Sequence, residues 1–162
     1  MKYKDYEPKI DSTAVNLGGD VIGNVTIKKD VNIWFNATIR GDMAGVTIEE
    51  GSNIQDNVVV HTNINQPTYI GKYVTVGHSA IIHACTVNDY ALIGMGSIIL
   101  DKAVIGEKAM VAAGTVVPPG KIVPPKTLAL GNPMRIIRDL TEKEIEANIN
   151  NSREYIKLSK EY

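Results

Sequence analysis

Aliphatic residues recur every six positions along most of this chain. Taking Val or Ile as the first position gives eighteen six-residue units between Val15 and Val123, with only three departures from the period. The fifth position of a unit is usually small or β-branched, and Gly or Asp often follows the aliphatic residue. Strands alternate with a period of two and helices with one near 3.6, so neither accounts for this pattern. A sustained period of six is typical of a parallel β-helix.

The repeat also predicts how the chain is organised. Three units make one triangular turn, so eighteen units give 18/3 = 6 turns of an all-β solenoid over residues 1–130. Residues 131–162 form a second segment that starts with the turn Gly131-Asn132-Pro133. There, Thr141-Glu142-Lys143-Glu144 is a capping box that predicts a helix running to about Tyr162. We expect a single domain whose C-terminal helix packs on the solenoid or on a neighbouring molecule.

Two interruptions of the period predict loops. Nine residues separate Ile39 from Ile48, and ten separate Val60 from Ile70, where six would continue the repeat. Insertions in solenoids are displaced outward, which predicts loops around 43–45 and 63–68.

All three histidines lie within this repeat. His61 and His83 each occupy the second position of a unit and are 83 − 61 = 22 residues apart. Removing the four-residue insertion leaves 18 residues, one full turn, so the two rings should stack on one face about 4.7–4.9 Å apart at the backbone. His78 is at the third position of its unit and therefore belongs to a different face. Three imidazoles match a catalytic metal site with one open position, and this one is complete only if another subunit of a closed three-fold ring supplies His78.

Composition narrows the classes of function. The formal net charge is −1, and no basic stripe or acidic tail is present, which argues against nucleic acid or anionic lipid as a partner. The single cysteine, Cys85, excludes an internal disulfide and is expected to be an inward-facing small residue rather than a ligand. No apolar run approaches the ~20 residues of a membrane span, and no apolar signal segment begins the sequence. We therefore expect a soluble cytoplasmic protein that binds itself and a small molecule.

Several motifs resemble those of one family, the gamma-class carbonic anhydrases. They are Arg40-Gly41-Asp42, the run from Asn53 to Asn57, His61-Thr62, Gly77-His78 and Ile82-His83. The resemblance implies a left-handed β-helix, an exception to the right-handed crossover rule. It also implies a homotrimer with an interfacial divalent metal, zinc first and iron or cobalt as alternatives, held by His61 and His83 of one subunit and His78 of the next. The implied reaction is metal-hydroxide hydration of CO2 to bicarbonate, a carbonate dehydratase activity.

The resemblance further implies roles for residues around the metal. Gln55 matches an amide that hydrogen-bonds the metal-bound solvent, which suits a group that donates and accepts without titrating. Arg40 and Asp56 match an ion pair near the site, and Asp42 matches a partner of arginine across the interface or a purely structural charge. Tyr155 in the C-terminal helix is a candidate for lining the pocket.

The chain departs from the archaeal prototype of this family, which carries glutamates in its loops. Met43 follows Asp42, and the segment from Thr62 to Tyr69 contains no Asp or Glu. Because regeneration of hydroxide requires proton transfer to solvent, we expect CO2 hydration to be slow or undetectable while metal binding is intact. Two alternatives stay open. One is a hexapeptide-repeat acyltransferase that uses acetyl or acyl coenzyme A, and the other is a metal-stabilised structural trimer or a thioesterase.

Overall fold

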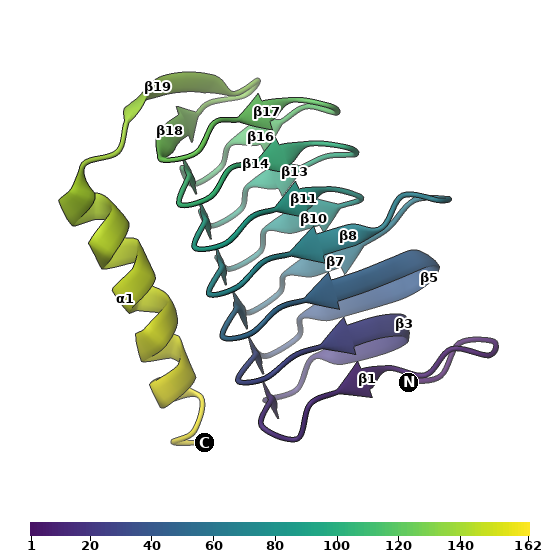
Figure 1. Ribbon diagram of the computed structural model, residues 1–162. Helices are drawn as coiled ribbons and strands as arrows, with labels where there is room; N and C mark the ends of the chain where they lie inside the picture. Colours follow the sequence, from purple (N-terminus) through teal and green to yellow (C-terminus); the bar gives the residue numbers. More distant parts are fainter.

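The six-residue units form the strands and corners of a solenoid. A computed structural model that describes all 162 residues is a left-handed parallel β-helix of about seven turns with one C-terminal helix (Figure 1). The predicted fold is therefore confirmed. Strands of successive turns stack in parallel, so each face of the triangular prism is a ladder of short strands.

Two long strands bend across the first two faces and join them into one eleven-stranded sheet; they are β3 (Asp20–Ile27) and β5 (Thr38–Ile48). The first face continues with β7 (Val59–His61), β10 (Ile81–His83), β13 (Ile98–Ile99) and β16 (Val116–Val117). The second face contains β1 (Lys9–Ile10), β8 (Thr68–Ile70), β11 (Thr86–Val87), β14 (Val104–Ile105) and β17 (Ile122–Val123). The third face is a separate sheet of β2 (Val15–Asn16), β4 (Asn32–Ile33), β6 (Asn53–Ile54), β9 (Thr75–Val76), β12 (Leu92–Ile93), β15 (Met110–Val111), β18 (Thr127–Leu130) and the antiparallel β19 (Arg135–Asp139).

The aliphatic first position of each unit fills the interior. Ile39, Ile54, Ile82 and Ile99 are completely buried, and they belong to a core cluster of 29 residues built from Val, Ile, Ala and Cys85. Each fully buried Val or Ile stabilises the folded chain by roughly 1.5–3 kcal/mol relative to an exposed one. The core is thus a column of aliphatic layers, one layer for each turn.

The solenoid has one turn more than the six counted from the sequence. At the N-terminal end, β1 (Lys9–Ile10) lies before the first recognised unit. At the other end, Ala129 of β18 fills the interior position that Val or Ile occupies elsewhere, and it is completely buried. The count fell short at this end because alanine occupies the interior position there and does not stand out in an aliphatic pattern.

One corner of the prism requires a left-handed backbone in successive turns. Asn36, Asn57 and Ser79 have φ of 58°, 59° and 60° there, and Gly96 and Gly114 follow with 65° and 67°. Asparagine and glycine tolerate this conformation better than most residues. His78 immediately precedes Ser79, so the tight corner carries its side chain outward from the prism.

The two interruptions of the repeat have different outcomes. The predicted loop at 63–68 is present, closed by an antiparallel bridge between Asn63 and Gln66. The insertion predicted at 43–45 lies within β5 rather than in a separate loop, but residues 42–45 have no partner in β3, whose Gly23 and Val25 pair with Gly41 and Val46. The extra residues lengthen β5 and are displaced from its ladder with β3.

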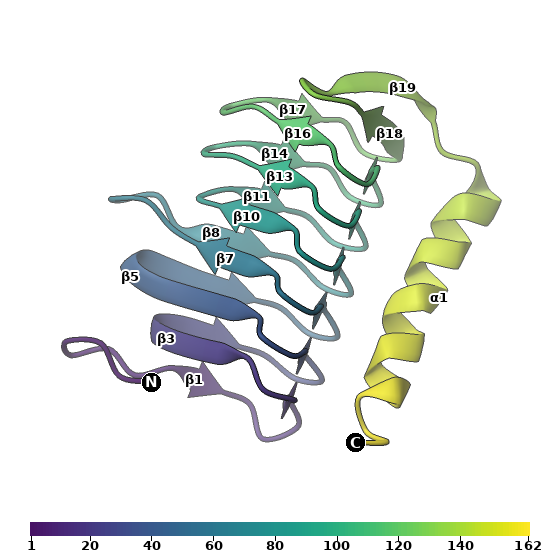
Figure 2. The same cartoon turned by 180° about the vertical axis from the view of Figure 1, so that it is seen from behind.

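The C-terminal helix runs back along the solenoid toward the N-terminal turn (Figure 2). Helix α1 (Glu142–Leu158) begins with the predicted capping box: the Thr141 hydroxyl accepts a hydrogen bond from the Glu144 amide, and the Glu144 carboxylate accepts one from the Thr141 amide. It ends at Leu158, earlier than expected. It is neither long nor apolar enough to cross a membrane.

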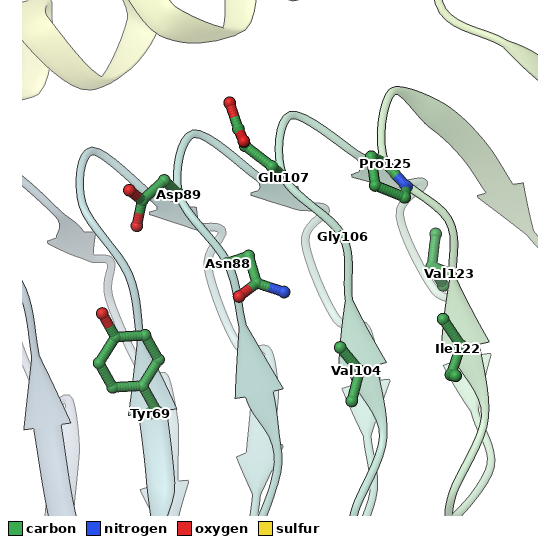
Figure 3. A pocket seen from close by; sticks show the side chains of 9 residues that line it. All are labelled: Tyr69, Asn88, Asp89, Val104, Gly106, Glu107, Ile122, Val123 and Pro125. Atoms are coloured by element: carbon green, nitrogen blue, oxygen red, sulfur yellow. The ribbon is translucent and has the colours of Figure 1, made fainter.

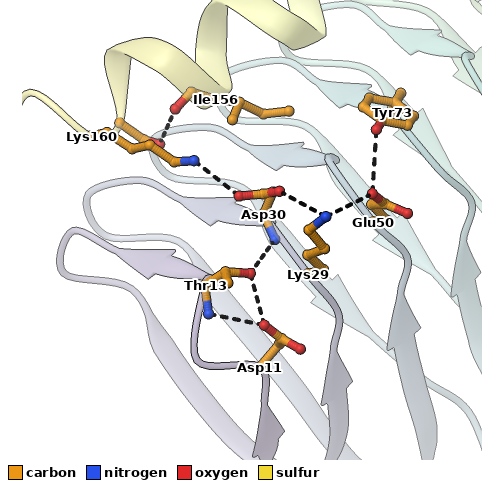
Figure 4. A network of polar contacts seen from close by, with 9 residues as sticks. Asp11, Thr13, Lys29, Asp30, Glu50, Tyr73, Ile156 and Lys160 are labelled. Carbon is orange, nitrogen blue, oxygen red and sulfur yellow. Dashed lines mark hydrogen bonds and ion pairs between the residues drawn. The ribbon is translucent and has the colours of Figure 1, made fainter.

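Contacts along its length hold α1 to the third face. The Tyr155 ring lies edge-on against Trp34, with 5.4 Å between centroids. Beyond the helix, the Lys160 ammonium is 3.0 Å from an Asp30 carboxylate oxygen, and Lys29 bridges Asp30 to Glu50 (Figure 4). The helix position therefore fixes where Tyr155 lies relative to the solenoid.

Candidate metal centre

His61 and His83 are the last residues of β7 and β10, and they pair directly in the sheet. Their ring centroids are 5.2 Å apart, and Nδ1 of His61 lies 3.3 Å from Nε2 of His83. The stacking that the 22-residue spacing predicted is confirmed. Because strand pairing fixes both backbones, the two imidazoles meet on the first face without help from a flexible loop.

A carboxylate holds the far side of each ring. Nε2 of His61 is 2.8 Å from Oδ1 of Asp42, and Nδ1 of His83 is 2.6 Å from Oδ1 of Asp101. A carboxylate accepts the ring N–H and leaves the lone pair on the opposite nitrogen. The two remaining lone pairs therefore face one another.

The facing nitrogens fit a shared metal ion. Two lone pairs 3.3 Å apart repel unless a cation or a proton lies between them. Two imidazole nitrogens at ~2.05 Å from a tetrahedral ion would be separated by roughly 3.3–3.4 Å. The observed separation and the choice of facing atoms thus suit two ligands of one ion.

Both supporting carboxylates are charged at neutral pH. Burial raises the pKa of Asp42, but hydrogen bonds from His61 and Arg40 outweigh it and hold the pKa below its usual value. Hydrogen bonds from Asn63 and His83 lower the pKa of Asp101, with burial opposing them. Two anionic groups behind the histidines add electrostatic attraction for a cation.

The third histidine lies elsewhere in the same chain. His78 is in the corner after β9, where its Nδ1 is 2.8 Å from Oδ2 of Asp56. No group of three or more His, Cys, Asp or Glu residues within the chain is placed to hold a metal ion. One chain therefore brings together two of the three predicted ligands.

Gln55 is fixed beside His78. Its Oε1 accepts a hydrogen bond from the His78 backbone N–H at 3.1 Å, and its Nε2 donates to Oδ1 of Asn53 at 3.0 Å. An amide nitrogen has two hydrogens, so one donor of Gln55 remains for a further partner.

A groove of about 320 Å³ opens next to these residues, between the third face and α1. Gln55, His78 and Tyr155 form polar parts of its wall, and Leu92 and Met110 are among the apolar ones. Tyr155 thus lines this groove, and its place at the metal site stays a prediction. Burial, with a smaller contribution from Asp56, raises the pKa of Tyr155, so its hydroxyl stays protonated at neutral pH.

Arg40 and Asp56, which were predicted to pair with each other, have other partners within one chain. Arg40 pairs with Asp42, two residues away, while Asp56 pairs with His78. The Arg40–Asp56 ion pair is not made inside the chain, and it stays a prediction for the assembled protein. Asp101 was missed by the sequence analysis, because Ile82 pairs with Ile99 and a full turn from His83 therefore ends at Leu100, one residue before Asp101.

A larger hollow of about 500 Å³ lies on the second face, away from the histidines (Figure 3). Tyr69, Val104 and Ile122 line it together with the carboxylates of Asp89 and Glu107. Asp89 already accepts a hydrogen bond from the Lys72 amide. The hollow contains no histidine, so the candidate metal ligands all lie on the first face and at the His78 corner.

Known proteins resemble the chain over nearly its whole length. The carbonic anhydrase of Geobacillus kaustophilus is 49% identical over 165 residues, which cover 99% of this chain and 88% of that protein. The chain belongs to the gamma-class carbonic anhydrase family. Gamma carbonic anhydrase 2 of Arabidopsis thaliana, a mitochondrial protein, is 42% identical over 98% of this chain, which spans 60% of the plant protein. Membership of this family implies a metal cofactor.

Solved structures with the same fold include proteins named for a different activity. A hexapeptide transferase family protein from Anaplasma phagocytophilum superimposes with a TM-score of 0.96 and 45% identity, covering 99% of this chain and 96% of that one. No protein-family model matches the chain. The β-helix is thus shared by proteins named for two different activities, so the site must distinguish between them.

Proposed function

We propose that this protein hydrates CO2 to bicarbonate at a divalent metal shared between subunits of a homotrimer, with zinc as the first candidate. His61 and His83 of one subunit and His78 of the next are the proposed ligands. The observation that carries the proposal is the pair of facing imidazole nitrogens 3.3 Å apart, each ring backed by a carboxylate. A bound divalent ion lowers the pKa of a coordinated water toward ~7 and so supplies a nucleophile at neutral pH.

The residues around the proposed site have distinct roles. The second N–H of the Gln55 side chain can donate a hydrogen bond to an oxygen of solvent or substrate beside His78, because its other polar atoms already have partners. Leu92 and Met110 offer an apolar wall suited to CO2, which has no charge and is poorly hydrated. Arg40 holds Asp42 against His61 and adds a positive charge that attracts bicarbonate.

The trimer is supported by apolar surfaces next to both halves of the site. Val59, Ile81, Ile98 and Val116 stack in register on the outside of the first face, beside His61 and His83, and Val59 and Ile81 are 40% and 36% exposed. The His78 corner has its own apolar groove. Apolar rows of this kind mark interaction surfaces. Joining one surface to the other is a heterologous contact, which closes as a ring.

We expect proton transfer from this site to solvent to be slow. Asp42 and Asp101 each hold a histidine ring, so neither is free to carry protons to solvent. The exposed residue after Asp42 is Met43, and the segment from Thr62 to Tyr69 has no carboxylate. We therefore expect slow turnover that added buffer accelerates.

Metal content per subunit tests the proposal. Wild type, His78→Ala and the exposed control Asp20→Ala would be purified with and without oxygen and measured by mass spectrometry. We expect about one ion per subunit in wild type and control, and little in His78→Ala. Stopped-flow CO2 hydration then measures turnover. A metal-free wild type under both conditions contradicts the proposal.

An acyl-transfer function is the second candidate. The Anaplasma protein is named as a transferase, and the apolar groove beside His78 has room for an acyl group with a histidine at its edge. Acyl transfer needs a single histidine base and no metal. Saturable binding of acetyl coenzyme A, with acetyl transfer that survives removal of metal by a chelator, would favour this function.

A further inference from the structure

Asp101 links the loop at Asn63 to the ring of His83. Its Oδ1 is 2.6 Å from Nδ1 of His83, and its Oδ2 accepts a hydrogen bond from Nδ2 of Asn63 at 2.7 Å. Asn63 is 38 residues away in the sequence. The three side chains belong to consecutive turns of the solenoid, so the contact fastens these turns together beside the facing nitrogens.

The loop residue is itself held in place. Oδ1 of Asn63 accepts a hydrogen bond from the Ile64 amide at 2.8 Å, which leaves the amide nitrogen of its side chain to face Asp101. The Asn63 backbone exchanges two hydrogen bonds with Gln66, 3.1 and 2.9 Å long. Asn63 therefore presents a donor to Asp101 from a closed loop.

The direction of these hydrogen bonds decides the state of His83. Asn63 offers only N–H to the carboxylate, so Asp101 acts as an acceptor toward both neighbours. A neutral His83 then carries its proton on Nδ1 and keeps the lone pair on Nε2, the atom that faces His61. The arrangement selects the tautomer that can bind a metal.

We propose that Asp101, oriented by Asn63, is a positioning residue that fixes the ring orientation and tautomer of His83 for metal binding. The inference rests on the proposed function, since His83 must be a ligand for its orientation to matter. It differs from the pairing of Asp42 with His61, which is completed by Arg40 from the same strand. The second pair is completed by a loop, so the conformation of that loop contributes to metal affinity.

Zinc affinity tests this role. Metal-stripped wild type, Asp101→Ala, Asp101→Asn and Asn63→Ala would compete with a chromophoric chelator for Zn²⁺, with Asp20→Ala as an exposed control. We expect Asp101→Ala to bind Zn²⁺ roughly 10–100-fold more weakly, the usual loss when a partner of a metal-bound histidine is removed. Asn63→Ala should show a smaller loss, and the control none.

A double variant separates hydrogen-bond direction from structural support. Asp101→Asn keeps an oxygen that accepts a hydrogen bond from His83. Its new amide nitrogen, however, would face the amide nitrogen of Asn63, and two donors cannot hydrogen-bond to each other. Adding Asn63→Asp restores an acceptor at position 63, so the double variant should bind Zn²⁺ more tightly than Asp101→Asn alone. Equal or weaker binding would contradict the proposed orienting role.

The outcomes also separate this inference from the proposed function. Wild type that takes up no Zn²⁺ would contradict the metal site as a whole. Wild type that binds Zn²⁺ while Asp101→Ala binds equally well would overturn only the role of Asp101. That role would also be overturned if Asp101→Ala lowered the urea midpoint of the metal-free protein but left zinc affinity unchanged, because such a result indicates a structural role.

Discussion

Because the core is built in layers, we expect a cavity-creating substitution to affect mainly the turns next to it. Ile82 and Ile105 are both completely buried, the first immediately before His83 and the second on the second face. Ile→Ala removes three carbon atoms, worth roughly 2.4 kcal/mol at 0.8 kcal/mol per buried CH2 group. With the cost of the cavity that remains, the total loss of folding free energy for such a substitution lies within about 2–5 kcal/mol. Both variants should therefore lose similar stability.

Their effects on the metal site should differ. In a solenoid each turn contacts mainly its neighbours, so a cavity acts locally. Ile82 is adjacent to His83 and pairs with Val60, which is adjacent to His61, and with Ile99, whereas Ile105 pairs with Val87 and Val123. Ile82→Ala should weaken zinc affinity well beyond any effect of Ile105→Ala.

The assay is urea unfolding at fixed protein concentration, followed by chelator competition at a temperature where both variants are folded. Fixed concentration is needed because assembly contributes to apparent stability. Equal loss of zinc affinity in both variants would refute the local reasoning. A loss of folding free energy below about 1 kcal/mol would refute the claim that these positions are tightly packed.

Three further predictions concern other parts of the chain. Burial raises the pKa of the Cys85 thiol to about 12, so it should not react with a thiol reagent at pH 8 until urea unfolds the protein; fast reaction of the native protein would contradict this burial. Hydrogen bonds from Arg138 and Thr141 lower the pKa of Glu144 to about 2 from 4.5. Its contribution to helix stability is therefore complete above pH 4.5 and lost as pH falls toward 2, and Glu144→Gln should remove this dependence of the far-ultraviolet circular dichroism. A Cβ at Gly94 would lie 2.4 Å from the backbone nitrogen of Ala113, so Gly94→Ala should lower the free energy of unfolding by about 1–3 kcal/mol in urea titration, and an unchanged midpoint would refute this contact.

The sequence was sufficient for the fold and for the histidine pair because both depend on period alone. Once a turn is 18 residues, the positions of His61 and His83 follow by subtraction, and the strand pairing agrees. The extra turn was missed because Ala129 takes the place of a larger aliphatic residue at the end of the core. The six-residue period therefore predicts the interior positions of the solenoid well, but not where the solenoid begins and ends.

The polar partners of the histidines were harder to predict. Asp101 reaches His83, and Asp56 reaches His78, through side-chain directions at corners whose backbone is irregular. Asp42 was expected to contact arginine and does so, but it also holds His61. Hydrogen bonds between side chains depend on ångström-scale geometry that six-residue spacing does not encode.

A mixing experiment tests the shared metal site most directly. His83→Ala and His78→Ala subunits, each expected to bind no metal alone, would be unfolded, mixed in equal amounts and refolded together. In a closed ring, a site is intact only where a subunit with His61 and His83 precedes one with His78, which random mixing gives at about one quarter of positions. We predict recovery of about one quarter of the wild-type metal content. A mixture that recovers no metal, under conditions where wild type refolds with its full content, would contradict a site shared between subunits.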